Sequence, residues 1–189
     1  MCGICGFSGD DKALVMKMAD AIVHRGPDQE GFYSDKYFSL AHKRLSIIDL
    51  SSRGKQPMHN EDGSIIVVYN GEIYNHAKLR EELEKKGHRF MSETDTEVIV
   101  HAYEQYGSSC VNHFRGIFAF AIYDRNKKQL FLARDHIGVK PLYYHYDGKD
   151  IIFASEIKSI LLHPSVRRNI CKRVVNDYLS FRYIPGEDT

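Results

Sequence analysis

The chain opens with the stretch MCGICGFS at residues 1–8. The apolar run from Gly3 to Ser8 predicts a short β-strand. If Met1 is removed, Cys2 carries both a thiol and a free α-amine, so a single residue supplies a nucleophile and a base. An α-amine has an ordinary pKa of about 7.7 to 8.0, so near neutral pH it can accept the proton of the thiol, whose ordinary pKa is about 8.5. The alternative is that Cys2 is only a small residue in a short motif that occurs by chance.

Length and composition predict a single globular domain. The 189 residues, 43% of them hydrophobic, are enough to bury one core. The chain has 26 basic and 25 acidic residues and a net charge of +1, without a basic block, so nucleic acid is not an expected partner. The sequence has no apolar run of about 18 residues and no basic and then apolar leader. It therefore predicts no membrane partner and a cytoplasmic location.

The four cysteines are expected to be reduced thiols; they are Cys2, Cys5, Cys110 and Cys171. A chain with an ample core does not need disulfides, and only the first two cysteines are close in sequence. No second C-x-x-C follows the pair at positions 2 and 5, and no two histidines have the spacing that places two ligands on one helix face. A zinc site would need long-range assembly, so no metal ligand is predicted, and Cys5 is expected to be a buried small residue.

Strands and helices alternate through the first part of the chain, where periodicity and turn residues predict both. The predicted strands are Gly3–Ser8, Gly31–Ser34, Tyr37–Leu45 and Ile65–Tyr69. The predicted helices are residues 13–23, with Asp10 or Asp11 as the N-cap, and His76–Lys86 and Asp95–Tyr106. The β-branched run at Ile65–Tyr69 is typical of a strand that is covered on both faces.

Strands separated by turn residues dominate the later part of the chain, as expected for antiparallel hairpins. The expected strands are Ile117–Tyr123, Gln129–Arg134, Leu142–Tyr146 and Ile151–Ala154, followed by helices at Glu156–Leu162 and Lys172–Phe181. This order predicts an α+β fold, most simply two antiparallel sheets between layers of helices. The final residues, 183–189, have turn character, which indicates either the edge of a longer protein or a short polar tail.

Six short segments, far apart in the sequence, carry a family resemblance together. They are MCGI at 1–4, HRGPD at 24–28, HKRLSI at 42–47, YNGEIYN at 69–75, TDTE at 94–97 and ARDHIGVKPLY at 133–143. In this order the set resembles the glutaminase domain of class II glutamine amidotransferases, in the asparagine synthetase branch. The resemblance spans nearly the whole chain. It implies the N-terminal nucleophile hydrolase fold, a four-layer αββα sandwich of two antiparallel sheets flanked by helices.

The resemblance implies a catalytic set of Cys2, Asn70 and Gly71. Cys2 would attack the side-chain amide of glutamine, pass its proton through its own amine to the departing ammonia, and form a thioester that water hydrolyses. The Asn70 side-chain amide and the Gly71 N–H would stabilise the tetrahedral oxyanion. An alternative for Asn70-Gly71 is a type I′ hairpin turn, which this dipeptide favours.

The resemblance also implies how a zwitterionic glutamine is held. Arg44 would bind its α-carboxylate, and Asp95 with Glu72 would bind its α-ammonium, while Leu45 and Ile47 complete the expected substrate-binding set. The alternatives are that Arg44 is a solvated strand residue and that Asp95 caps the helix after it. Within the HRGPD segment, residues 25–28 are expected to form a loop that closes over glutamine; the alternative is a plain turn that ends the preceding helix.

By resemblance, the ammonia would pass to an ATP-dependent amide-forming domain, C-terminal or separate, and the 134–143 segment would lie toward it. The alternative for this segment is an ordinary strand and turn. No Ser-Gly-Gly-x-Asp-Ser or Walker-type motif occurs, so ATP and magnesium are expected only in that partner and no cofactor in this domain. Residues 1–170 are interpreted as the glutaminase domain and 171–189 as a linker or the start of a truncated synthetase domain. A homodimer is compatible with this interpretation. The alternatives are a glutamine-sensing or docking module and an amidase for a larger amide.

Overall fold

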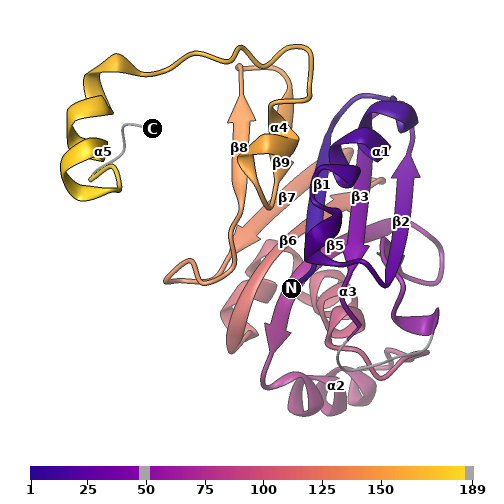
Figure 1. The fold of residues 1–189 in the computed structure, drawn as a ribbon. Helices are drawn as coiled ribbons and strands as arrows, with labels where there is room; N and C mark the ends of the chain where they lie inside the picture. Colours follow the sequence, from indigo (N-terminus) through magenta and orange to yellow (C-terminus); the bar gives the residue numbers. More distant parts are fainter. Residues whose placement is uncertain (47–51, 186–189) are drawn as a thin grey trace.

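Two antiparallel sheets form the centre of the computed structural model, which describes residues 1–46 and 52–185 (Figure 1). The first sheet has the strand order β2-β3-β1-β9-β8 and the second β4-β5-β6-β7. The first sheet consists of β1 (Gly3–Ser8), β2 (Gln29–Ser34), β3 (Phe38–Arg44), β8 (Tyr143–Tyr146) and β9 (Ile151–Ala154). The second consists of β4 (Met58–His59), β5 (Ile65–Ile73), β6 (Gly116–Asp124) and β7 (Gln129–Arg134).

Helices cover the outer face of each sheet. The α-helices are α1 (Lys12–Asp20), α2 (His76–Lys85), α3 (Asp95–Tyr106), α4 (Ile157–Ile160) and α5 (Val175–Phe181). Short 3-10 turns are η1 (Val23–Arg25), η2 (Ser52–Gly54), η3 (Gly107–His113) and η4 (Lys172–Val174). Helices α1 and α4 pack on the first sheet, whereas α3 packs on β5 of the second sheet and α2 packs on α3.

The buried apolar residues divide into three layers that match a four-layer sandwich. The central layer joins both sheets; it includes Ile4, Leu40, Val68, Ala121 and Phe153. A second layer lies between the first sheet and α1, and a third between the second sheet and α3. Strand β5 belongs to two of them, because Ile66 and Val68 face the central layer while neighbouring Val67 and Tyr69 face α3. The prediction that this strand is covered on both faces is therefore confirmed.

Most predicted elements are present within a few residues of the expected bounds, and Asp11 accepts the Leu14 N–H at 2.8 Å as the N-cap of α1. Strand β5 is the main difference, because it continues to Ile73 and pairs Asn70 with Ala119 and Gly71 with Phe118. The alternative of a type I′ turn at Asn70-Gly71 is therefore wrong.

Four other details of the predicted elements differ from the structure. The short strand β4 and the turn η3 were not predicted. The helix expected at Glu156–Leu162 is the single turn α4, and the one expected at Lys172–Phe181 begins with the 3-10 turn η4. Each of these elements is short, so its sequence carries too few periods to show a pattern.

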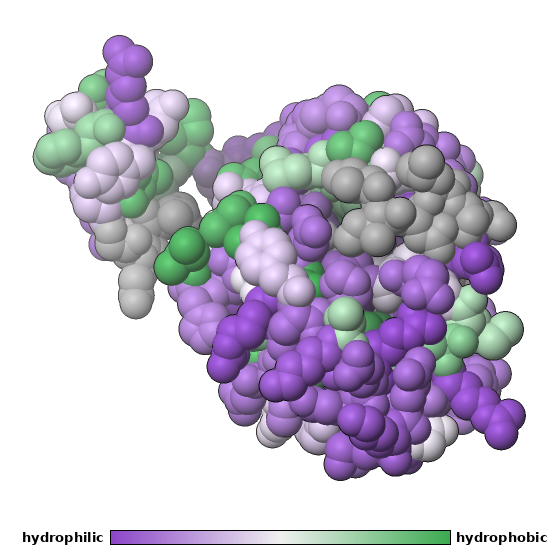
Figure 2. Space-filling model, turned by 90° about the horizontal axis from the view of Figure 1, so that it is seen from below, coloured by the Kyte–Doolittle hydropathy of each residue, from purple (hydrophilic) through white to green (hydrophobic). Residues whose placement is uncertain are grey.

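The segment from η4 through α5 projects from the two sheets, as Figures 1 and 2 both show. Val174 in η4 is buried, but most apolar side chains of α5 are exposed; Leu179 is 72% and Phe181 58% accessible, and Tyr183, which follows α5, is 62% accessible. The division into 1–170 and 171–189 stays a prediction. Among the described residues, no helix is both long and apolar enough to span a membrane.

Candidate active site

One pocket of about 100 Å³ collects side chains from both sheets and from the first turn of α3. Of the predicted site residues it contains Cys2, Arg44, Leu45, Asn70, Gly71, Glu72 and Asp95. The remaining predicted residue, Ile47, lies outside the described residues. The pocket forms where the start of β1, the end of β3 and the end of β5 meet α3, and with Lys140 at its border it brings together residues up to 139 positions apart, from Met1 to Lys140.

The Cys2 thiol lies half-buried beside the backbone that follows β3. The Leu45 N–H donates to Cys2 Sγ at 3.4 Å, and the thiol lies 3.7 Å from the Leu45 carbonyl oxygen. Burial raises the pKa of Cys2, although the Leu45 contact, the N-terminal ammonium and the Arg44 guanidinium oppose the shift. The thiol is therefore protonated at neutral pH and needs a base before it can act as a nucleophile.

Arg25 anchors the backbone of Cys2. Its Nε donates to the Cys2 carbonyl oxygen at 3.0 Å, and its Nη1 pairs with Glu156 Oε1 at 3.1 Å. His24 Nε2 contacts the same carboxylate oxygen at 2.8 Å. The side chain of Arg25 thus contacts the backbone of Cys2, and the closing of residues 25–28 over glutamine stays a prediction.

The outer edge of β5 directs its N–H groups toward the pocket. The Tyr69 N–H donates to Gln56 Oε1 at 2.6 Å, and the Ile73 N–H donates to Asp95 Oδ2 at 2.9 Å. Alternate N–H groups of a strand point to the same side, so the Gly71 N–H between them faces this edge as well. Gln56, Gly71 and Asp95 all line the pocket, which places the Gly71 N–H at its wall.

The Asn70 side chain is buried in the pocket wall with 1% of its surface exposed. Its Nδ2 has no hydrogen-bond partner among the described residues. An unpaired buried donor costs about 1 to 3 kcal/mol, so such a group in a pocket indicates a missing acceptor. Next to it, a Cβ on Gly71 would collide with Ile117 O and Phe118 Cα, so only glycine fits between β5 and β6.

Asp95 and Arg44 place opposite charges in the pocket. Asp95 is the first residue of α3 rather than its cap, because Thr94 Oγ1 accepts the Glu97 N–H at 3.4 Å, so the capping alternative is wrong. The Tyr69 hydroxyl donates to Asp95 Oδ2 at 2.6 Å. Arg44 is only 6% exposed and donates to Gln29 Oε1 at 2.7 Å, which excludes the solvated alternative. The two side chains can therefore bind both ends of a zwitterion.

Comparison with known proteins agrees with this geometry. The profile of the family described as "Glutamine amidotransferase domain" matches residues 1–189. The chain belongs to this family. The amidotransferase domain is 40% identical to asparagine synthetase [glutamine-hydrolyzing] 1 of Bacillus subtilis over 100% of this chain and 31% of that protein. It is 44% identical to asparagine synthetase [glutamine-hydrolyzing] 2 of the same organism over 99% of this chain and 25% of that protein. The chain thus spans about a quarter to a third of the length of these relatives.

A solved structure supports the fold. The glutamine phosphoribosylpyrophosphate amidotransferase of B. subtilis, complexed with ADP and GMP, matches with a TM-score of 0.68 and 19% identity. The match covers 85% of this chain and 43% of that chain. The amidotransferase domain therefore has the predicted N-terminal nucleophile hydrolase fold, with its two antiparallel sheets between helices.

Sequence reasoning missed several residues that shape the site of the amidotransferase domain. Gln56 bridges the Tyr69 N–H and Thr96 Oγ1, and it comes from a segment in which neither a helix nor a strand was predicted. Gly54 lies so close to Arg44 that a Cβ would meet the guanidinium. Lys140 borders the pocket from the 133–143 segment. Only tertiary contacts distinguish these residues from ordinary loop residues.

His42 supports the strand of Asn70 from the opposite sheet. It is fully buried, and its Nε2 donates to the Tyr69 carbonyl oxygen at 3.1 Å. Burial lowers the pKa of His42 to about 3, so the ring is neutral. The pocket itself holds no candidate metal cluster among the described residues; the group with suitable donors consists of His101 and Glu104 on α3 and His88 in the loop before it.

Proposed function

We propose that this domain hydrolyses the side-chain amide of glutamine and releases ammonia. The observation that carries the proposal is the unpartnered, buried Nδ2 of Asn70, which lines the same pocket as the Cys2 thiol. The N–H of Gly71, the next residue on β5, supplies a second donor. Two neutral donors beside a nucleophile suit a tetrahedral oxyanion, whose negative charge appears only during the reaction.

The reaction uses Cys2 as both nucleophile and base once Met1 has been removed. The freed α-amine takes the thiol proton, and Sγ forms a bond to the amide carbon while the carbonyl oxygen becomes the oxyanion. The amine then gives the proton to the departing nitrogen, which leaves as ammonia when the C–N bond breaks. Water attacks the thioester, Sγ leaves with the proton restored, and glutamate is released.

Substrate recognition rests on charge. Arg44 pairs with the α-carboxylate of glutamine, and the planar guanidinium suits bidentate binding. Both contacts to Asp95 from Tyr69 and Ile73 go to Oδ2, which leaves Oδ1 to accept from the α-ammonium. Glu72, exposed at the pocket rim, adds negative charge on the same side. Leu45 and Ile47 complete the proposed substrate-binding set.

The ammonia acceptor is proposed to be an ATP-dependent, amide-forming domain of the asparagine synthetase type. Support comes from the relatives, because the chain covers 25% to 31% of two proteins named as glutamine-hydrolysing asparagine synthetases. ATP and magnesium would act in that partner rather than in this domain. The cytoplasmic location and the homodimer stay predictions.

Intact mass and glutamate release on one sample test the proposal. The expected result is that protein without Met1 releases glutamate from glutamine and that Cys2→Ala abolishes release. Cys171→Ala is the matched control, because this thiol is exposed and outside the pocket. Protein that retains Met1 should be inactive, since its Cys2 nitrogen is an amide. Equal rates in Cys2→Ala and wild type would overturn the mechanism.

If the wild-type protein without Met1 releases no glutamate, covalent labelling with an electrophilic glutamine analogue distinguishes the remaining explanations. Labelling at Cys2 would show that the nucleophile is competent and that the partner domain is needed for turnover. Measurable glutamine binding without labelling would instead favour the sensing module.

A further inference from the structure

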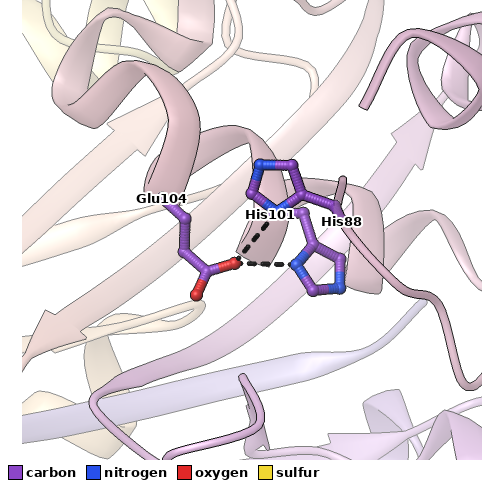
Figure 3. A group of neighbouring side chains, drawn as sticks. All are labelled: His88, His101 and Glu104. Atoms are coloured by element: carbon purple, nitrogen blue, oxygen red, sulfur yellow. Dashed lines mark hydrogen bonds and ion pairs between the residues drawn. The ribbon is translucent and has the colours of Figure 1, made fainter. Parts of the chain in front are cut away.

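A second group of polar side chains consists of His101 and Glu104 on α3, about two turns beyond Asp95, and His88 in the loop before this helix. His101 Nδ1 is 2.7 Å from Glu104 Oε2, and His88 Nδ1 is 3.5 Å from the same oxygen. Figure 3 shows both imidazole rings turned toward this one carboxylate. One donor atom from each residue lies within 4.8 Å of the other two, so the three side chains converge on a single point.

The hydrogen-bond partners of His88 leave the lone pair of its Nδ1 directed at the point where the three side chains converge. Its Nε2 lies 3.2 Å from Gln105 Oε1, an acceptor, so this nitrogen carries the ring hydrogen of the neutral tautomer. Nδ1 then presents a lone pair toward Glu104 Oε2, which is also an acceptor. Two acceptors that face each other repel unless a proton or a metal cation lies between them.

The surrounding residues hold the other two side chains in place. Asn60 Nδ2 donates to Glu104 Oε1 at 2.7 Å, which leaves Oε2 directed at the histidines. His101 is buried, with the Phe90 ring edge-on at 4.6 Å between centroids. Its Nε2 lies 3.8 Å from Glu97 Oε1. A carboxylate behind the far nitrogen of a histidine is the arrangement that commonly orients metal ligands.

We propose that His88, His101 and Glu104 form a binding site for a divalent transition-metal ion of the zinc class, with a water molecule as fourth ligand. Two imidazoles and one carboxylate are a known zinc donor set, and tetrahedral coordination at about 2.0 to 2.2 Å places donors about 3.4 Å apart. Each of the two imidazole rings would ligate the ion through its Nδ1. His101 also borders a cavity of about 330 Å³, lined by charged and polar residues together with Pro57, Met58 and Met91, which offers an entry path.

A bound ion would join two segments that meet only in the tertiary structure. His88 follows α2, just after Gly87 with its φ of 99°, whereas His101 lies in the middle of α3 and Glu104 in its last turn. The ion would tie the connection between the helices to the helix that begins with Asp95. The expected role is structural, and it does not depend on glutamine hydrolysis.

A proton is the competing occupant of this site. Burial lowers the pKa of His101, but Glu104 and Glu97, with a further effect of Glu61, outweigh it and raise the pKa to about 9. His101 therefore carries a proton in the metal-free protein at neutral pH, and a metal ion must displace it. Binding measurements belong in mildly alkaline buffer, where this competition is weaker.

The test is a titration of chelator-stripped protein with Zn²⁺ by calorimetry, repeated with Co²⁺ by absorption spectroscopy. Wild type should bind one ion per chain, and Co²⁺ should show ligand-field bands without a thiolate charge-transfer band. His88→Ala should weaken Zn²⁺ binding at least about ten-fold. His136→Ala is the matched control, an exposed histidine outside the cluster that should leave affinity unchanged.

Two further measurements keep the proposal open to contradiction. Glu104→Gln removes a ligand while it keeps the side-chain shape, and unfolding in chelator shows whether each variant is folded. Zn²⁺ should raise the unfolding temperature of wild type and His136→Ala but not of folded Glu104→Gln. Equal Zn²⁺ affinity in wild type and His88→Ala would overturn the proposal. A thiolate band, lost on Cys2→Ala, would overturn it as well by placing the ion on cysteine.

Discussion

Helix α3 borders two polar clusters that are incomplete in opposite ways. At its N-terminal end, the pocket around Asp95 contains a buried donor, Asn70 Nδ2, that has no acceptor among the described residues. Two turns later, His88 and Glu104 direct acceptor atoms at one point. The first arrangement suits a ligand that develops negative charge, and the second suits a cation. The unpaired donor and the facing acceptors therefore indicate two different types of ligand beside one helix.

The largest expected effect concerns the unpaired donor. Asn70→Ala should lower kcat for glutamate release about 100- to 1000-fold, because one oxyanion donor is lost. The free energy of unfolding should change little, since Nδ2 has no protein partner to lose. Steady-state kinetics and urea unfolding measure the two quantities.

Asn60→Ala is the matched control for that variant. Asn60 donates to Glu104 and accepts the Ile65 N–H at 3.0 Å, so its removal should lower stability by about 1 to 3 kcal/mol and leave kcat unchanged. If Asn70→Ala destabilised the protein as much as Asn60→Ala does, the contrast between the clusters would fail.

The next effect tests the charge at the N-terminal end of α3. Asp95→Asn keeps an oxygen for Tyr69 or Ile73 but removes the negative charge that faces the substrate ammonium. A charge-assisted hydrogen bond contributes about 1.5 to 3 kcal/mol, so KM for glutamine should rise roughly 10- to 100-fold. Asp124→Asn, a buried carboxylate outside the pocket, should leave KM unchanged. An unchanged KM in Asp95→Asn would remove the proposed ammonium site.

A smaller effect is expected at the second cluster without metal. Glu104→Gln in chelator should lower the free energy of unfolding by about 1 to 2 kcal/mol, because the close pair with buried His101 is lost. The ratio kcat/KM should not change. Glu82→Gln, whose ion pair with Lys78 spans 3.9 Å on the exposed face of α2, should cost under about 0.5 kcal/mol. Equal losses in the two variants would show that the cluster adds no more than a surface pair.

The smallest expected effect is a pH dependence near Cys2. Burial alone would raise the pKa of Glu156, but Lys158, Arg25 and His24 outweigh it and lower the pKa to about 2. A lowered pKa in the folded state contributes stability above the unfolded value, about 4.5, that is lost as the pH falls toward 2. The unfolding temperature should therefore fall over this range. Glu156→Gln should be less stable near neutral pH and show a smaller acid-induced loss; an identical pH profile would contradict the assignment.

The local pattern of the sequence was sufficient to predict the long helices and strands. Strand β5 and helix α3 each combine apolar spacing with several turns or periods, so their positions were predictable. The end of β5 was not predictable, because Asn70-Gly71 satisfies both a tight turn and a strand that accepts only glycine against β6. The conformational preference of the Asn-Gly dipeptide favours a turn, whereas hydrogen bonding to β6 makes both residues part of the strand.

The site was predictable where the residues carried chemistry in ordered motifs. The structure gathers seven of the eight predicted residues around one pocket, whereas Ile47 lies outside the described residues. Gln56 and Arg25 were assigned no such contacts, because their roles depend on partners at Tyr69 and Cys2 that are distant in sequence. A side chain in a loop has no local feature that indicates which distant backbone it will contact.

The sequence by itself determined the family, the α+β class and the chemical types available near Cys2, because these depend on residue identity and short-range order. Only the tertiary structure decided which polar atoms are buried without partners and which converge. Those properties arise when the two sheets and α3 pack, since packing excludes water and makes each unpaired donor or acceptor costly. The spacing of the histidines gave no reason to expect a metal ligand, yet folding places His88 beside His101 and Glu104.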